Sequence, residues 1–292
     1  MEIVHYETSM RDDVLELFSE EYGMTPESFG KIFDALYEHP IQREKCIRLV
    51  AIENGTVAGF QSYMYWPYKS ENGTHFKSFQ SGNSIVGKNF RGKGVFTKLL
   101  RAIDSDSLQL DFDFMVGFPV EQSFGAFMKC GWKNPFNLEW HVTLNNPIAS
   151  FFREPDLNSS GPWPLISSGF KNESSGLFEM VYSTEFDDYR SKLRPDCHHR
   201  FEFKVDGRTW IADCKSQSRG SKLTETIIGK ITSDGQGRPS RTIVRLILQK
   251  IRAELKTTFV SIALPPGSED MLPSRFYKTK KELRFIVKEG NL

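Results

Sequence analysis

The alternation of apolar and polar positions predicts two β-hairpins in the first third of the chain. Residues 47–66 contain two strand-like runs around an Asn-Gly pair at 54–55, and residues 66–86 contain two more around a second pair at 72–73. Asn-Gly between such runs is the strongest short-range hairpin signal, because both residues tolerate the positive φ angles of a tight turn. We therefore expect antiparallel strands here.

Helical periodicity precedes these hairpins. After a short strand at 3–8, apolar residues at helical spacing predict a helix over 11–22. Thr25 followed by Pro26 has the pattern of an N-cap and a first helical residue, so a second helix should run to about Tyr37.

Helices and strands alternate after the hairpins. The expected elements are a helix over 95–105, a strand over 112–117, a short helix over 122–129 and one or two strands within 132–144. Strands that are separated by helices predict a mixed sheet with a parallel pair.

The second half repeats this order without obvious sequence identity. Its expected elements are a helix over 186–193, a hairpin over 201–214, a strand over 223–232, a glycine turn over 233–241, a helix over 242–255, a strand over 258–264, a helical segment over 268–278 and a strand over 283–288. We predict two related α/β (α+β) folds in tandem, each a mostly antiparallel sheet with one parallel strand pair and flanking helices.

Breaker-rich sequence separates the two halves. Residues 146–180 are rich in Asn, Ser, Gly and Pro, and a structureless loop of this length is unusual inside one compact domain. We expect a domain at 1–145, a linker or lid at 146–180 and a second domain at 181–292.

Composition narrows the class of protein. The 292 residues favour two domains, and 38 basic against 37 acidic residues leave a formal charge of +1, which gives no support for nucleic-acid binding. The four cysteines contain no CxxC pair, which favours reduced thiols. Without a signal peptide or an apolar run of spanning length, we expect a cytoplasmic protein that does not insert into membranes.

The stretch 84–100 carries the clearest chemistry. A strand end is followed by a basic turn with Gly92 and Gly94 and then by a helix start. Glycines allow close backbone approach to a ligand, and the amides and dipole of a helix N-terminus favour an anion. With Arg91 and Lys93 at the same corner, the turn predicts a phosphate or pyrophosphate site.

Two motifs resemble the GNAT superfamily of acyl-CoA-dependent N-acyltransferases. The first is Val86 followed by Arg-Gly-Lys-Gly-Val-Phe at 91–96, and the second is the segment 117–132, which ends in Cys-Gly-Trp. The resemblance covers about residues 1–145. It implies acetyl-CoA as co-substrate, pantetheine between strands 76–86 and 112–117, and cofactor contacts from Val86, Arg91, Gly92, Lys93, Gly94, Val95, Phe96 and Thr97.

The acid–base residues depart from the family pattern. Phe127 stands where many relatives have a general-acid tyrosine, and strand 76–86 has no carboxylate. Glu121, Ser123 and Asn83 are the candidate catalytic residues that remain. Glu121 also fits the simpler role of an acid that stabilises a helix N-terminus.

The acceptor is less defined by the sequence. Tyr63, Tyr65 and Gln80 are candidate substrate-binding residues, although alternation also fits one packed sheet face. The favoured function is acetyl transfer to a primary amine of a small metabolite, such as an amino sugar or nucleotide-amino sugar. The alternatives are a non-catalytic acyl-CoA-binding or regulatory module and a protein-amine acetyltransferase.

No metal site is expected. The Cys-His-His segment at 197–199, even with Cys214, matches no zinc-binding spacing. The glycine turn of the second half contains Pro239, which lacks an N–H donor, so we expect that half to be non-catalytic. The sequence leaves the oligomeric state open.

Overall fold

The computed structural model describes residues 1–292 except 71, 106–107, 109, 146–169, 173–175, 182, 194–197, 220–222, 234–238 and 291–292. The chain divides into two compact units. Unit 1 comprises Met1–Pro135, Lys171–Leu193 and Arg284–Leu292, and unit 2 comprises Phe136–Phe170 and Arg194–Leu283. The units are interleaved along the chain, whereas the sequence predicts consecutive domains. The predicted linker at 146–180 lies largely outside the described residues.

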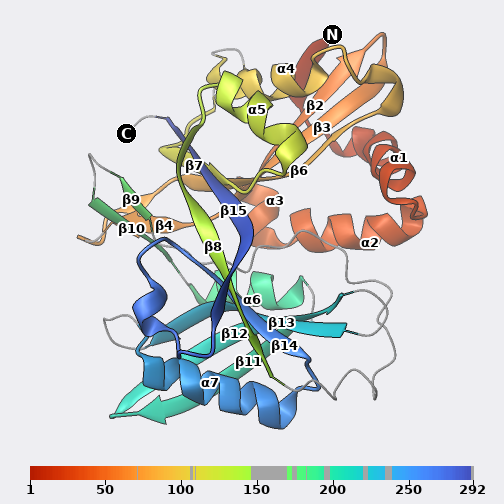
Figure 1. Ribbon diagram of the computed structural model, residues 1–292. Helices are drawn as coiled ribbons and strands as arrows, with labels where there is room; N and C mark the ends of the chain where they lie inside the picture. Colours follow the sequence, from red (N-terminus) through yellow and green to blue (C-terminus); the bar gives the residue numbers. More distant parts are fainter. Residues whose placement is uncertain are drawn as a thin grey trace. The chain divides into compact units, whose positions relative to one another are not determined.

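Unit 1 is an α/β structure (Figure 1). Its helices are α1 (Arg11–Tyr22), α2 (Pro26–Tyr37), α3 (Pro40–Lys45), α4 (Val95–Arg101), α5 (Glu121–Lys129) and α6 (Thr184–Lys192), with short 3-10 turns at Thr8–Met10, Lys88–Phe90 and Ala102–Asp104. Its strands are β1 (Glu2–His5), β2 (Ile47–Glu53), β3 (Thr56–Tyr65), β4 (Tyr68–Ser70), β5 (His75–Phe76), β6 (Ser78–Val86), β7 (Phe114–Gly117), β9 (Phe170–Asn172) and β10 (Gly176–Met180).

The main sheet of unit 1 has the order β1-β2-β3-β6-β7-β15, where β15 is Tyr277–Glu289. Its pairs are antiparallel except β6–β7, which are parallel and separated in sequence by α4. The mixed sheet and its parallel pair confirm the expected fold class. The second predicted hairpin only partly forms there, because β4 and β5 pair in a separate small sheet, β5-β4-β10-β9.

Neighbouring residues of β3 face opposite layers of helices. Phe60 packs edge-on against the rings of Phe18 in α1 and Tyr37 in α2. The α-carbon of Gly59 faces Val95 and Leu99 of α4. This alternation, which is the ordinary period of a strand, places α1 and α2 on one face of the sheet and α4 on the other (Figure 1).

Gly59 allows α4 to approach the sheet closely. A Cβ atom there would lie 2.9 Å from the backbone oxygen of Ile85, an atom that cannot rotate away. We expect Gly59→Ala to lower the free energy of unfolding by about 1–3 kcal/mol, measured by urea titration. Gly125→Ala is the matched control, since its Cβ would meet nothing within 4 Å on a helix. A Gly59→Ala variant as stable as the control would contradict this packing.

Unit 2 repeats the order of strand, helix and parallel strand. Its elements are β11 (His198–Val205), β12 (Arg208–Arg219), β13 (Leu223–Ser233), α7 (Arg241–Glu254), β14 (Phe259–Leu264) and a 3-10 turn, η6 (Glu269–Met271). Strands β11, β12 and β13 are antiparallel neighbours, and β13 and β14 are parallel with α7 between them. One apolar stripe of α7 is buried against this sheet: Ile243, Val244, Ile247, Leu248 and Ile251.

Two strands exchange between the halves of the sequence. Strand β8 (Lys133–Leu144) follows α5, yet its residues from Glu139 onward pair with β14 of unit 2. Strand β15 follows the second half, yet its residues from Ile286 onward pair with β7 of unit 1. This exchange explains why the compact units are interleaved along the chain.

The expected helical segment at 268–278 is wrong. Only Glu269–Met271 forms a 3-10 turn, and β15 begins at Tyr277. Pro273 explains the difference, because proline inside a helix removes one hydrogen bond and clashes with the preceding turn. The short helix α3 at Pro40–Lys45 was not predicted from the sequence. Among the described residues, no helix is long and apolar enough to cross a membrane.

Candidate functional site

The basic glycine turn between β6 and α4 leaves helix amides uncapped. Gly92 and Gly94 have φ angles of 77° and 73°, which side-chain-bearing residues rarely adopt. Gly94 is the N-cap of α4 and provides no side-chain cap. The first amides of a helix have no partner within it, so those of Val95, Phe96 and Thr97 remain available for an external acceptor.

The side chains of the turn are held by nearby acceptors. Arg91 donates to the carbonyl oxygen of Val86 at 3.2 Å and pairs with the carboxylate of Glu21. The Lys93 ammonium lies 3.8 Å from the carboxylate of Glu53. These carboxylates balance part of the positive charge of the turn.

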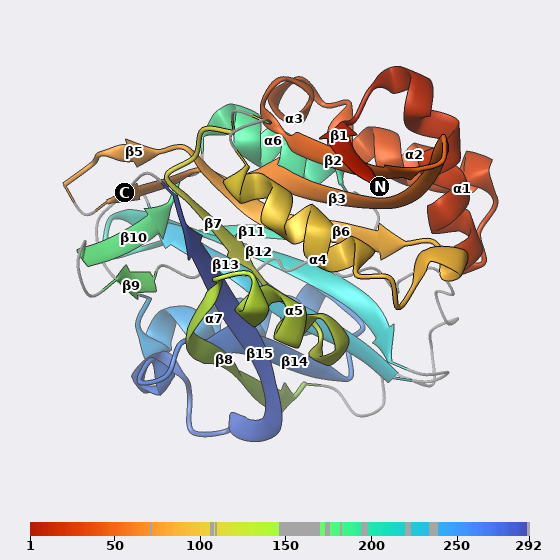
Figure 2. The same cartoon turned by 90° about the horizontal axis from the view of Figure 1, so that it is seen from above.

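The pairing of the two parallel strands beside the turn ends where β7 ends. Their pairing runs from Ser78 opposite Phe114 to Ser81 opposite Gly117, and β6 then continues to Val86 paired only with β3 in the described structure (Figure 2). The β7-facing edge of β6 therefore has no strand partner over its last residues. An unpaired strand edge can bind an extended ligand through main-chain hydrogen bonds.

A buried polar network surrounds an irregularity in β6. Asn83 has a φ angle of 49°, and its Nδ2 donates to the Tyr37 hydroxyl at 2.9 Å. The Tyr37 and Ser62 hydroxyls are 2.8 Å apart, and Ser62 donates to the carbonyl oxygen of Gly82 at 2.8 Å. Since Ser62 uses its proton on Gly82, Tyr37 must donate to Ser62. Burial raises the pKa of Tyr37, which keeps this hydroxyl protonated.

A second polar group joins β3 to β6 beside this network. Gln61 is fully buried, its Nε2 donates to the Ser81 hydroxyl at 3.1 Å, and its Oε1 accepts from Ser84. Sequence reasoning missed Tyr37, Gln61 and Ser62 as site residues. The available signal was the Gln-Ser pair inside the otherwise apolar strand β3, because buried polar side chains need defined partners.

The candidate substrate-binding residues do not gather on one face of the sheet. Tyr63 is opposite Ser81, whereas Gln80 is opposite Met64, one position further along the same ladder. Cross-strand partners share a face and successive pairs alternate, so Tyr63 and Tyr65 lie on one face and Gln80 on the other. The Tyr63 hydroxyl and Gln80 Oε1 are buried without a hydrogen-bond partner in the described structure.

The remaining candidate catalytic residues lie at the start of α5. The Glu121 side chain is 80% exposed and pairs with Arg284 at 2.6 Å. Ser123 donates to the carbonyl oxygen of Val120, one turn earlier. Phe127 is buried edge-on between the rings of Phe96 and Trp132. Glu121 thus has the contacts of a surface helix-terminal acid.

The Cys-His-His segment at 197–199, where no metal site is expected, lies partly outside the described residues. These do not include Cys197 or residues 234–238 of the glycine turn. His198 Nε2 lies 3.7 Å from Asp213, which also accepts from Arg200 at 2.7 Å. His198 therefore belongs to a cluster of ion pairs around Asp213.

Tyr37 closes the polar network, and its removal gives a specific prediction. We expect Tyr37→Phe to lower the free energy of unfolding by about 1–3 kcal/mol, because Asn83 and Ser62 each lose a buried partner. Urea titration measures the change, with Tyr277→Phe as control because Tyr277 is 71% exposed. Equal stability of the two variants would show that the network contributes nothing.

The fold is that of the GCN5-related N-acetyltransferases. A structure of a GCN5-related N-acetyltransferase from Kribbella flavida has a TM-score of 0.62 and 12% sequence identity to this chain. The alignment covers 99% of this chain and 71% of the Kribbella flavida chain. A second such structure, from Anabaena variabilis, has a TM-score of 0.61 and 13% identity, and the alignment covers 99% of this chain and 72% of that one. Eis1 from Mycobacterium abscessus has a TM-score of 0.57 and 9% identity, and the alignment covers 99% of this chain and 74% of Eis1. No family model matches the sequence, and a search of curated proteins finds no significant match.

Proposed function

We propose that the protein transfers an acyl group, acetyl in the simplest case, from acyl-CoA to a primary amine of a small metabolite. The observation that carries this proposal is that β6 continues beyond the end of β7 to the turn that leads to the uncapped N-terminus of α4. The amides of that turn would bind the pyrophosphate of CoA, and the unpaired edge of β6 would bind its pantetheine arm.

The chain's residues define what catalysis would require. A backbone N–H of β6 would polarise the thioester carbonyl while the neutral amine attacks it. Strand β6 carries no carboxylate or histidine, and each hydroxyl of the Tyr37–Ser62 network already donates its proton. Rate enhancement would then come from positioning and carbonyl polarisation, with the amine entering unprotonated. As the C–N bond forms and the C–S bond breaks, the proton that the amine loses would pass to the departing CoA thiolate.

An amino sugar or nucleotide-amino sugar is the proposed acceptor class. The polar network at β3 and β6 contains only uncharged groups, from Tyr37, Gln61, Ser62 and Asn83. Such groups suit the hydroxyl-rich sugar part of the acceptor.

A second candidate is a non-catalytic acyl-CoA-binding module. The observation that favours it is Phe127, whose buried ring cannot donate a proton to the leaving thiolate. A protein-amine acceptor is a further alternative within the transferase class.

Two measurements on the full chain separate these functions. Calorimetric titration with acetyl-CoA and with CoA should give stoichiometric binding, and absence of binding to both would overturn the proposed cofactor. A thiol-release assay over small amines, amino sugars, nucleotide-amino sugars and peptide amines then tests turnover. Binding without thiol release from any acceptor would favour the non-catalytic module.

A further inference from the structure

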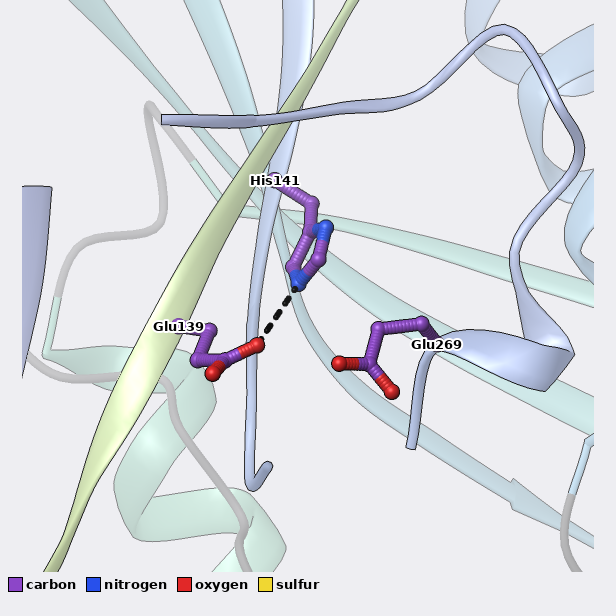
Figure 3. A group of neighbouring side chains, drawn as sticks. All are labelled: Glu139, His141 and Glu269. Carbon is purple, nitrogen blue, oxygen red and sulfur yellow. Dashed lines mark ion pairs between the residues drawn. The ribbon is translucent and has the colours of Figure 1, made fainter. Parts of the chain in front are cut away.

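Three potential metal ligands of unit 2 converge on one point (Figure 3). Glu139 and His141 lie two residues apart on β8 and therefore project from the same face of the strand. Glu269 comes from η6, in the segment that follows β14. One ligand atom from each side chain lies within 4.8 Å of the other two.

Two of these atoms are buried without a hydrogen bond. His141 is only 4% exposed, and its Nε2 and Glu139 Oε2 form an ion pair, yet neither has a hydrogen-bond partner in the described structure. The two atoms are 3.7 Å apart, beyond hydrogen-bond range. A buried polar atom without a hydrogen bond destabilises the folded protein, so the arrangement calls for a further partner.

The spacing fits two ligands of one ion. Ligands at about 2.0–2.1 Å from a tetrahedral ion are separated by about 3.3 Å, so a contraction of a few tenths of an ångström brings Glu139 and His141 into range. Glu269 is exposed and can adjust its side-chain torsions to complete the group.

The surroundings leave the inner ligand atoms available. Lys278 pairs with Glu139 Oε1 at 2.5 Å, which orients the carboxylate so that Oε2 points to the cluster.

We propose that Glu139, His141 and Glu269 bind a divalent transition-metal ion, with zinc as the expected ion. One imidazole nitrogen and two carboxylate oxygens are typical zinc ligands, and three protein ligands leave a fourth position for water. The ion would tether the segment after β14 to β8 within unit 2. The proposal is independent of acyl transfer.

Zinc binding to the full chain tests the proposal. The protein is stripped with a chelator and titrated with Zn²⁺ against a chromophoric chelator, and Co²⁺ is added separately to record its visible absorption. We expect one ion per chain, a Kd at least 10-fold weaker in Glu269→Gln, and no change in Asp270→Asn. Both substitutions remove one exposed carboxylate from η6, but only the first removes a ligand.

Two results would overturn the site. One is that Zn²⁺ does not bind, or binds equally to the unmodified chain and Glu269→Gln, so that Glu269 is not a ligand. The other is equal weakening by Asp270→Asn, which would indicate a general charge effect. Far-UV circular dichroism of both variants establishes that each is folded.

A different observation carries a second proposal. Three arginines, with Gln249, Pro273 and Ser274, line a cavity of about 270 Å³ in unit 2: Arg245, Arg252 and Arg275. Burial and the charges of Arg252 and Arg245 lower the pKa of Arg275, and its Nε is buried without a hydrogen-bond partner. Three arginines and no acidic residue line this cavity, so it concentrates positive charge.

We infer that this cavity binds a phosphate-bearing ligand. Guanidinium groups match phosphate oxygens in geometry and remain charged at neutral pH. Arg245, Gln249 and Arg252 are spaced four and three residues apart on α7, so their side chains share one helix face.

Pyrophosphate titration by calorimetry tests this cavity. Every protein in the series carries Gly94→Asp, so the turn before α4 does not contribute. We expect binding that weakens at least 10-fold on Arg275→Met and less than 2-fold on Lys250→Met, which removes one charge from α7 outside the cavity. Absence of binding, or equal weakening by both substitutions, would overturn the inference.

Discussion

Gly94→Asp is expected to weaken CoA and acetyl-CoA binding at least 100-fold. Gly94 caps α4 with a φ angle of 73°, and a side chain there would project into open space beside the amides of Val95 and Phe96. An aspartate would add backbone strain and place a negative charge where the proposed pyrophosphate binds. Calorimetric titration of both ligands measures the loss.

Gly207→Asp is the matched control. Gly207 has a φ angle of 75°, and a Cβ there would also meet nothing within 4 Å, but it lies in the β11–β12 turn of unit 2. The two substitutions therefore introduce similar strain and the same charge. Equal acetyl-CoA affinity of the two variants would remove the α4 turn as the cofactor site.

Phe60→Ala is expected to lower the free energy of unfolding by about 3–5 kcal/mol. Phe60 is fully buried on β3, and its ring contacts the rings of Tyr6, Phe18, Phe33 and Tyr37. Truncation would remove the residue that joins α1 and α2 to the sheet and leave a large cavity. Urea titration followed by circular dichroism measures the change.

Tyr22→Ala provides the comparison within the same aromatic cluster. The Tyr22 ring stacks on Phe18 and Phe29 but is 50% exposed, so its loss should cost about 1 kcal/mol or less. If Phe60→Ala and Tyr22→Ala lower the free energy of unfolding equally, Phe60 is not the main stabilising residue of this cluster.

Local signals made the glycine turn predictable from sequence. Positive φ angles select glycine at 92 and 94 whatever the distant packing, and the hairpin turn at 54–55 follows the same rule. The cap at Thr25 is equally local, since its side chain accepts from the Ser28 amide three residues later.

The polar network and the Glu139–His141–Glu269 group could not be predicted from sequence, because both depend on which residues pair across distant strands. Whether Gln80 shares a face with Tyr63 is decided by which residues are opposite each other on β3 and β6, and the irregularity at Asn83 changes the alternation. Glu139 and Glu269 meet only because β8 pairs with β14, an exchange for which the sequence contains no short-range signal.

The strand exchange has a consequence for synthesis of the protein on the ribosome. Strand β7 acquires its outer neighbour only when residues 286–289 of β15 emerge, long after α1 to α5 have been made. Until then the β7 edge of unit 1 presents unpaired amides and carbonyls, the kind of edge that favours pairing with other chains. A chain that is halted before residue 286 would therefore carry an open sheet edge in its first unit.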